Sequence, residues 1–467
     1  MFGHTFLRID SEYDSKLLSY AVNYAADANQ DTENGFIFAI KGLIGGYYGR
    51  YSLLPYYDKL KEYRDSEQRD IWEYDLDLTE AEVQRMFRHI WELNGTHSYY
   101  YFFTENCSYN ILWFIEAARP SLHIREKFNF QVIPIATVHA TNDLGIVKEK
   151  THFRPSRRTT ILTYEKLLDK QYINLTIELS NDNVDVTSVL NNKQIIKKQK
   201  AYILETAIEL VEYKYSKSDI SKKQFLSRFH KLTKARATLG QQKTIDIKRA
   251  SDPLQGHKDF RTNLSLGVRD DEFIQMFGIR PAYHDLKDSS YGFLQGTQIE
   301  FLNFLVSHSK ENNFELENGT LLSIASIASR TDFFKPYSWR LNFGWDRNYL
   351  DDSSNFLATV GGGFSWRNSL GYMYIMVDPL AYMEDTLQTG IGGSLGFQFD
   401  KYTKTTTNLE LTHRFYENGD EQLLIDLTQS IRLEQNFQLQ LNYNYKEREL
   451  VKDTDEQTFK VNLNYYF

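Results

Sequence analysis

The single cysteine of the chain lies where a helix is predicted to begin. The aromatic run at residues 99–103 is typical of a strand, and apolar residues then recur with helical spacing from Ser108 to Ala118, before Pro120. Cys107 is therefore expected near a helix N-terminus, where free backbone N–H groups and the helix dipole stabilise a thiolate. The same N–H groups can bind a developing oxyanion, so this position suits a thiol nucleophile.

A thiol nucleophile needs a base, and His4 is the strongest candidate among the 11 histidines. It stands at the start of an apolar segment, residues 2–9, which is predicted to be a strand. A strand-borne histidine that faces a helix-borne cysteine is the arrangement used by papain-like enzymes. Because His4 precedes Cys107, this arrangement requires a permuted version of that fold. His97, which is close to Cys107 in the sequence, is the competing base.

A third group is expected to orient the histidine. Asn23 lies in the next predicted strand, residues 20–24, and an amide can fix the tautomer of an imidazole. Taken singly each feature is weak, since a lone cysteine is most often a small buried apolar residue. It is the combination of Cys107, His4 and Asn23 that predicts a catalytic site.

Composition excludes several classes of protein. The 467 residues suggest about three domains. A net charge of −8 argues against a nucleic-acid-binding protein, and 41% hydrophobic with 25% charged residues excludes a disordered chain. No uncharged apolar run approaches the length of about 18 residues that a membrane helix needs. No CxxC, HExxH or EF-hand spacing occurs, so we predict neither a metal site nor a cofactor.

The last 200 or so residues show the strict alternation of β-strands. In residues 459–467, Phe459, Val461, Leu463, Tyr465 and Phe467 share one face, and polar side chains occupy most of the other face. We count about twelve such segments, with approximate starts at residues 262, 272, 297, 314, 338, 355, 370, 389, 405, 423, 436 and 456.

An even number of strands of this kind predicts an antiparallel transmembrane β-barrel, apolar outside and polar inside. The alternative is a soluble sandwich or barrel, whose core could not hold long amide and charged side chains without partners. The alternation ends on Phe467, which resembles the C-terminal signal that outer-membrane barrels present for insertion. We therefore expect the barrel assembly machinery to be a partner during insertion.

The chain divides by composition into three regions. Residues 1–160 mix short apolar runs with helical patterns, 161–255 are predicted to be a basic helical linker region, and 256–467 form the barrel. Residues 191–250 contain 15 Lys or Arg and 5 acidic residues. A solvated pair of helices explains this charge, and a basic collar that attracts anionic lipid headgroups is the alternative.

Five segments of the first third of the chain resemble the Lnb N-terminal periplasmic domain family. They read FGHTFLRI, YAVNYAAD, GLIGGYYGRYSLLPYY, RDIWEYDLDL and FTENCSYNILWFIEAARP. That family is similar to permuted papain-like folds, including the lecithin–retinol acyltransferase group, where an Asn-Cys pair opens the catalytic helix. The resemblance implies an α+β permuted papain-like domain with Cys107 as nucleophile and His4 as base. The role of Asn23 is inferred from its position.

The resemblance also implies thiol-dependent acyl transfer in the bacterial envelope, as by a lipoprotein N-acyltransferase. We therefore expect an acyltransferase or hydrolase in the outer membrane with a periplasmic domain, and membrane lipids, lipoproteins or peptidoglycan as partners. Residues 1–4 lack the basic and apolar parts of a secretory signal, so we expect an export signal upstream. Three alternatives remain: a cysteine peptidase or amidase acting on peptidoglycan, a non-enzymatic pore with an inert periplasmic domain, and a structural anchoring role.

Overall fold

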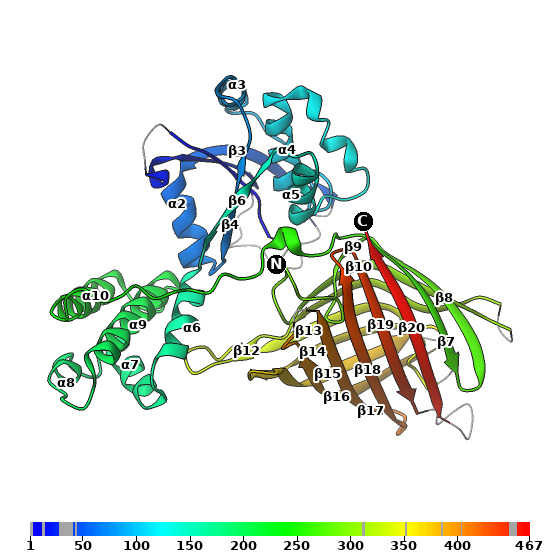
Figure 1. Ribbon diagram of the computed structural model, residues 1–467. Coiled ribbons are helices and arrows are strands. Elements are labelled where there is room, and N and C mark those ends of the chain that lie inside the picture. The colour runs from blue at the N-terminus through cyan, green and yellow to red at the C-terminus, as the bar shows by residue number, and fades with distance from the viewer. Residues whose placement is uncertain are drawn as a thin grey trace. The chain divides into compact units, whose positions relative to one another are not determined.

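The structure is a computed structural model that describes residues 3–11, 15–27, 41–42, 44–310, 313–350, 353–383, 386–402, 404–447 and 455–467. The chain forms two compact units, Met1–Arg249 and Ala250–Phe467 (Figure 1). The first unit mixes helices and strands, and the second consists almost entirely of strands.

The first unit is built on a small antiparallel sheet. Its strand order is β1-β2-β3-β5, with bounds Leu7–Ile9, Tyr20–Ala26, Tyr47–Pro55 and Ser98–Tyr100. A separate ribbon pairs β4 (Ile71–Leu76) with β6 (Val147–Arg154). Four helices belong to this part: α2 (Tyr56–Lys61), α3 (Glu80–Glu92), α4 (Cys107–Ala118) and α5 (Pro134–Asp143).

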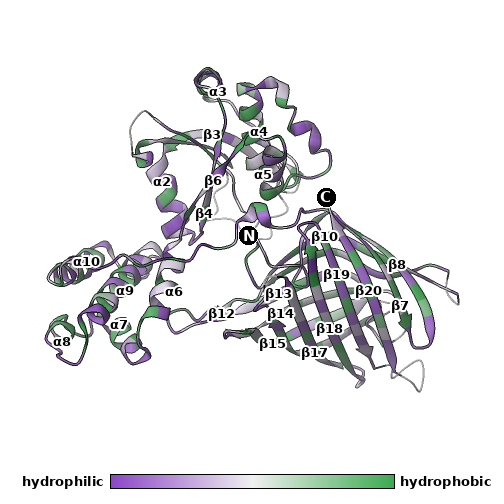
Figure 2. Ribbon diagram, in the orientation of Figure 1, coloured by the Kyte–Doolittle hydropathy of each residue, from purple (hydrophilic) through white to green (hydrophobic). Residues whose placement is uncertain are grey.

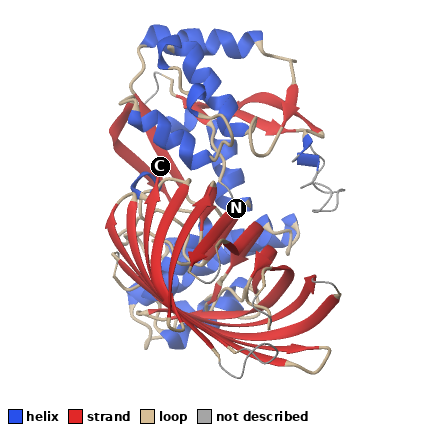
Figure 3. Ribbon diagram, turned by 90° about the vertical axis from the view of Figure 1, so that its right-hand side faces the viewer, coloured by secondary structure: helices blue, strands red, loops and turns tan. Residues whose placement is uncertain are grey.

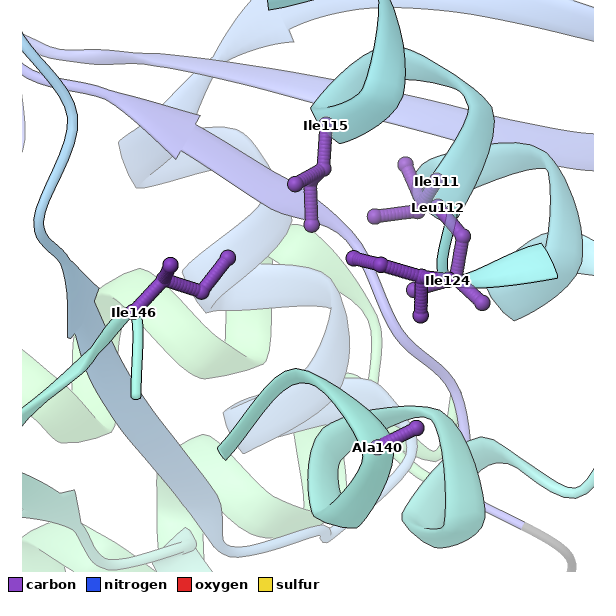
Figure 4. Packing of buried hydrophobic residues seen from close by; sticks show 6 residues of the cluster. All are labelled: Ile111, Leu112, Ile115, Ile124, Ala140 and Ile146. Carbon is purple, nitrogen blue, oxygen red and sulfur yellow. The ribbon is translucent and has the colours of Figure 1, made fainter. Parts of the chain in front are cut away.

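Helix α4 is the central helix of this part, because it buries side chains on two sides. Ile111, Leu112 and Ile115 pack with Ile124, Ala140 and Ile146 (Figure 4). On another face, Phe114 and Ala118 pack with Val22 of β2 and with Met86 and Ile90 of α3. This packing fixes the position of the first residue of α4, since a helix held on two faces cannot slide along its axis without opening cavities.

The rest of the first unit is helical. Its helices are α6 (Arg157–Leu167), α7 (Ile173–Ser180), α8 (Thr187–Leu190), α9 (Lys197–Ser216) and α10 (Lys222–Ala237). The buried guanidinium of Arg157 binds Glu209 and Glu212 of α9 and also Asp65, which follows α2. The region predicted to be a basic helical linker, residues 161–255, is therefore helical up to Ala237, and its helices pack within the first unit.

The second unit is a closed antiparallel barrel of twelve strands, as predicted. The ring is closed by the pairings of β20 with β7 and of β10 with β11. Its strands are β7 (Arg261–Arg269), β8 (Glu272–Arg280), β10 (Thr297–Ser309), β11 (Glu315–Ser326), β13 (Ser338–Asp346), β14 (Asn355–Arg367), β15 (Gly371–Met383), β16 (Leu387–Phe399), β17 (Thr405–Tyr416), β18 (Glu421–Glu434), β19 (Phe437–Lys446) and β20 (Glu456–Tyr466). Each begins within two residues of its predicted start. Figure 3 shows the strands curving around the barrel.

The barrel is apolar outside and polar inside. On β20, Leu463 keeps 44% of its surface exposed whereas the neighbouring Asn464 is fully buried. Figure 2 shows this alternation of apolar and polar residues along the barrel strands. A soluble fold would bury the leucine, so the outer face is built to contact lipid. Two short extra strands, β9 (Ala282–His284) and β12 (Ser329–Arg330), pair with β10 and β14.

Among the described residues, no helix combines the length and the apolar character needed to cross a bilayer.

Candidate active site

The first turn of α4 is held by the residue that precedes the cysteine. Asn106 is the N-cap: its Oδ1 accepts hydrogen bonds from the backbone N–H groups of Ser108 at 3.1 Å and Tyr109 at 3.3 Å. Its Nδ2 donates to the carbonyls of Phe102 at 3.0 Å and Val132 at 2.7 Å. The Asn-Cys pair thus has a local physical reason, because the cap places Cys107 at the first position of the helix.

His4 and Asn23, predicted as base and orienting group, lie side by side. The His4 Nε2 is 2.6 Å from Asn23 Oδ1, and Asn23 is buried in the middle of β2. His4 lies in the extended segment just before β1, which pairs with β2 through Leu7 and Val22. The amide oxygen accepts from the protonated Nε2, which leaves Nδ1 as the nitrogen that can exchange a proton with another group.

The sulfur of Cys107 lies among polar groups rather than in hydrocarbon. Burial raises the pKa of the Cys107 thiol. The favourable influence of the His4 ring, the backbone N–H of Thr5 and the Tyr100 hydroxyl on the thiolate outweighs this effect, and the net shift of the pKa is downward. Only 4% of Cys107 is exposed. The arrangement therefore favours a thiolate, and a substrate reaches it only if covering side chains move.

The interaction between Cys107 and His4, which lowers the pKa of the thiol, raises the pKa of the imidazole. Burial lowers the pKa of His4, but the hydrogen bond and charge of Cys107 and the hydrogen bond of Asn23 raise it, and the net pKa lies above 6.5. Lys59 opposes this shift weakly from nearby. A lowered thiol pKa beside a raised imidazole pKa is the electrostatic pattern of a thiolate–imidazolium pair.

Tyr100 also belongs to this site, and the sequence did not single it out. The backbone N–H of Cys107 donates to the Tyr100 hydroxyl at 3.3 Å. Burial and the neighbouring Cys107 raise the pKa of Tyr100 well above its usual range, so the hydroxyl stays protonated and can donate. Its alternation with exposed Tyr99 in β5 is the one signal that could have indicated an inward-facing hydroxyl.

The structure does not bring the competing base to the sulfur. His97 is exposed, and its ring packs edge-on against Tyr48 with 4.6 Å between the ring centroids. The ring of Tyr63 stacks on the ring of His4, with 5.6 Å between the ring centroids. The predicted set Cys107, His4 and Asn23 is therefore assembled in one place, with Tyr63 and Tyr100 around it.

A second cluster of potential ligands lies in the barrel unit. His257, His284 and Asp288 place ligand atoms within 4.8 Å of one another. The two imidazoles hydrogen-bond each other at 3.0 Å, and Arg280 and Arg261 both bind Asp288. Two guanidinium groups on the carboxylate oppose a further cation, so these residues fit a buried ion-pair network better than a metal site. Short-range spacing motifs could not have revealed the full cluster, since His257 lies 27 residues before His284 and only His284 and Asp288 are close in the sequence.

The fold defines a class: an outer-membrane barrel whose chain also carries an α+β domain. Comparison with protein families refines this, because residues 1–143 match the Lnb N-terminal periplasmic domain family. The chain thus joins a periplasmic domain of the Lnb N-terminal family to a twelve-stranded outer-membrane barrel.

Two further matches cover the remaining regions. Residues 151–246 match a domain of unknown function, DUF7842, and residues 250–466 match another, DUF7840. Among curated proteins, none matches the chain.

Solved outer-membrane structures resemble the barrel region at low similarity. The NanC porin is 8% identical, with a TM-score of 0.31, and the match covers 44% of this chain and 100% of the porin. The KdgM porin is 12% identical, with a TM-score of 0.28, over 44% of this chain and 99% of the porin. Omp33 of Acinetobacter baumannii is 10% identical, with a TM-score of 0.24, over 45% and 99%. The barrel assignment itself follows from the strand pairing.

Proposed function

We propose that the periplasmic domain is a thiol-dependent acyltransferase or hydrolase, with Cys107 as nucleophile, His4 as base and Asn23 as the residue that orients His4. The observation that carries this proposal is the chain of contacts from Asn23 through the His4 ring to a cysteine at a helix N-terminus. This is the arrangement of permuted papain-like enzymes, in which each group has one task.

The proposed reaction has two steps. His4 takes the Cys107 proton, and the thiolate attacks the carbonyl carbon of an ester or amide, so that a carbon–sulfur bond forms and an oxyanion develops. His4 then gives its proton to the departing alcohol or amine, which leaves a thioester on Cys107. An amine or water then gives a proton to His4 and attacks the thioester, the carbon–sulfur bond breaks, and the thiolate is restored beside the protonated His4.

Two donors are available for the oxyanion. The backbone N–H of Cys107 points at the Tyr100 hydroxyl across 3.3 Å. We assign these two groups as donors to the substrate oxygen, which would bind beside them and accept from both in place of their mutual hydrogen bond. Removal of one such donor typically costs about 10²–10³-fold in rate. Tyr100→Phe is therefore expected to slow thioester formation by about that factor.

Membrane phospholipid is the proposed acyl donor, because the barrel anchors the domain to a bilayer and so keeps lipid esters at high local concentration. Lipoproteins are the proposed acyl acceptors. Peptidoglycan stem peptides are the competing substrates, since the same thiolate chemistry cleaves amides.

The test is to incubate the purified full-length chain with phospholipid that carries labelled acyl chains, or with muropeptides, and to measure the intact mass. An acyl adduct that forms from lipid, disappears in Cys107→Ala and is reduced in His4→Ala supports the acyltransferase. His97→Ala is the matched control, because His97 is exposed and should leave the adduct unchanged. Cleavage of muropeptides without a lipid adduct supports the peptidase instead. Equal activity of wild type and Cys107→Ala would falsify the thiol mechanism.

A further inference from the structure

Much of the inner face of the barrel is buried, although it lines a lumen; the Asp426 side chain on β18 keeps 32% of its surface exposed. On β18, β19 and β20, the inward residues Thr428, Ser430, Gln438, Asn442 and Asn464 keep at most 4% of their surface exposed. In an open channel the inward side chains face water, because a barrel of this size is wider than its own side chains can fill. Other parts of the chain must therefore occupy the lumen.

One connection between strands does so. Strand β8 ends at Arg280 and β10 begins at Thr297, and the intervening residues 281–296, here called the plug segment, contain only the short strand β9. A two-residue turn would suffice to join two antiparallel strands, as residues 270–271 do between β7 and β8. The plug segment is thus much longer than the connection requires.

Inward side chains converge on the backbone of this segment. The Lys287 carbonyl accepts from Ser430 Oγ at 2.6 Å, from Gln438 Nε2 at 2.9 Å and from Gln440 Nε2 at 3.0 Å. The Leu286 carbonyl accepts from Gln398 Nε2 on β16 at 3.1 Å. Donors on β16, β18 and β19 therefore reach a loop that is attached to β8 and β10.

Side chains of the plug segment continue this pattern. Lys287 Nζ is 2.7 Å from Asp426 on β18. Leu286 packs on a buried cluster that includes Tyr372 and Tyr374 of β15. Together with the donors on β16, β18 and β19, these contacts lie on a part of the wall that is several strands away from β8 and β10 in either direction around the ring. The segment therefore crosses the lumen.

A buried ionic cluster binds the plug segment to the first and last strands of the barrel, at the start of β7 and the end of β20. Asp288 is fully buried and binds Arg280 at 2.6 Å, and the Tyr466 hydroxyl donates to it at 2.6 Å. Asp285 accepts from Arg261 at 2.8 Å. Arg261 and Tyr466 are themselves partners in the pairing of β7 with β20. Breaking a buried, paired charge is costly, so this cluster resists withdrawal of the segment.

The opposite end is narrowed by a second turn. After β13, Tyr349 packs on Tyr382 at 5.0 Å and on Tyr416 at 5.3 Å, and Leu350 is fully buried with them. Lys446 Nζ on β19 donates to the Arg347 carbonyl at 2.8 Å. The plug segment therefore fills one end of the lumen, and this turn narrows the other end without filling it.

We propose that residues 281–296 form a built-in plug, and that the barrel is a sealed membrane anchor rather than a pore. This inference does not depend on the thiol chemistry. It argues against the alternative in which the barrel conducts and the periplasmic domain is inert.

Conductance of the full chain in planar bilayers tests the proposal directly. The wild type is expected to show no stepwise current, and a variant with residues 282–295 replaced by a four-residue Gly-Ser turn is expected to conduct. Heat-dependent gel mobility shows whether each barrel has folded. Open-pore steps from the wild type would overturn the proposal. If the shortened variant folds but shows no conductance, the assignment of the plug to this segment is wrong.

Chemical labelling gives an answer even if the shortened variant does not fold. In a Cys107→Ser background, Thr428→Cys places a thiol on the fully buried inner face and Asn418→Cys places one in an exposed turn. With a water-soluble maleimide, the Thr428→Cys thiol is expected to react about 100-fold more slowly, because labelling requires local opening. Equal rates at the two positions would contradict a sealed lumen.

Discussion

The His4 Nε2 and the Asn23 Oδ1 lie 2.6 Å apart, and under the proposed mechanism this contact sets which ring nitrogen serves the thiol. Because the amide oxygen holds the proton on Nε2, Nδ1 is left to exchange a proton with Cys107. Asn23 thus controls a tautomer from a strand that precedes the cysteine by more than eighty positions.

Asn23→Ala is expected to reduce the rate of thioester formation by about 10- to 100-fold, since a hydrogen bond to a charged group contributes about 1.5–3 kcal/mol. The measurement is the rate at which the acyl adduct forms, followed by intact mass in incubations stopped at successive times. Ser52→Ala is the control: Ser52 lies opposite Asn23 on β3, and its hydroxyl donates to the Asn23 backbone carbonyl at 3.4 Å, not to the Asn23 side chain. If both variants react as fast as wild type, Asn23 has no orienting role.

The thiolate of Cys107 is expected to form at a lower pH than that of an ordinary cysteine. A thiolate appears as pH rises through the thiol pKa, and the pKa of Cys107 is lowered from 9.0. The ultraviolet absorbance of wild type minus that of Cys107→Ser reports the thiolate without any need for reagent access.

His4→Ala removes the hydrogen bond and the positive charge while burial remains, so the midpoint of this titration should move to higher pH. His97→Ala should leave it in place, because His97 is exposed and packs on Tyr48. An unchanged midpoint in His4→Ala would mean that the imidazole does not stabilise the thiolate.

Asn106→Ala is expected to loosen the first turn of α4. The change removes the cap of two helix N–H groups and the two bonds that tie the loop to Phe102 and Val132. Loss of a cap alone costs about 1 kcal/mol, and the orphaned carbonyls add to this.

Hydrogen exchange of the α4 amides in the full chain measures this effect, with faster exchange expected over the first turn. Thr79→Ala, which removes the exposed cap of α3, is the control and should affect α3 alone. Unchanged protection of α4 in Asn106→Ala would show that packing alone holds this helix.

The barrel could be predicted closely from sequence, and the site only in part. A strand alternates with period two, so Phe459 to Tyr465 reveal both the strand and its lipid-facing side without any long-range information. Cys107 and His4 could be linked because a helix start and a strand-borne imidazole are local features.

Two features were not accessible in this way. Tyr100 is one aromatic residue in a run of five, and only the tertiary contact with the Cys107 N–H distinguishes it. The plug segment is a polar loop in sequence, and its partners Gln398 and Gln438 lie more than a hundred residues away. Contacts at such separation leave no periodic signal.

Val461→Lys is expected to destabilise the barrel. Val461 lies in the middle of β20 on the outer face, and a lysine facing lipid at mid-bilayer costs about 2–4 kcal/mol. The measurement is the midpoint of urea unfolding in lipid vesicles, followed by heat-dependent gel mobility. Asn418→Lys adds the same charge in an exposed turn and should be neutral. Equal midpoints for the two variants would place Val461 away from lipid.

The partly buried Arg340, whose side chain is 22% exposed, tests whether lumen charges stabilise the barrel as a set. Its guanidinium binds Asp378 at 2.7 Å, Glu410 at 2.9 Å and Ser394 at 2.7 Å. Arg340→Met leaves two carboxylates facing each other without a cation, and this is expected to cost about 3–5 kcal/mol. Adding Asp378→Asn and Glu410→Gln removes the repulsion and should restore most of the stability. The urea midpoint in vesicles measures both variants, and a triple variant no more stable than Arg340→Met would show that Arg340 acts through its packing and not its charge.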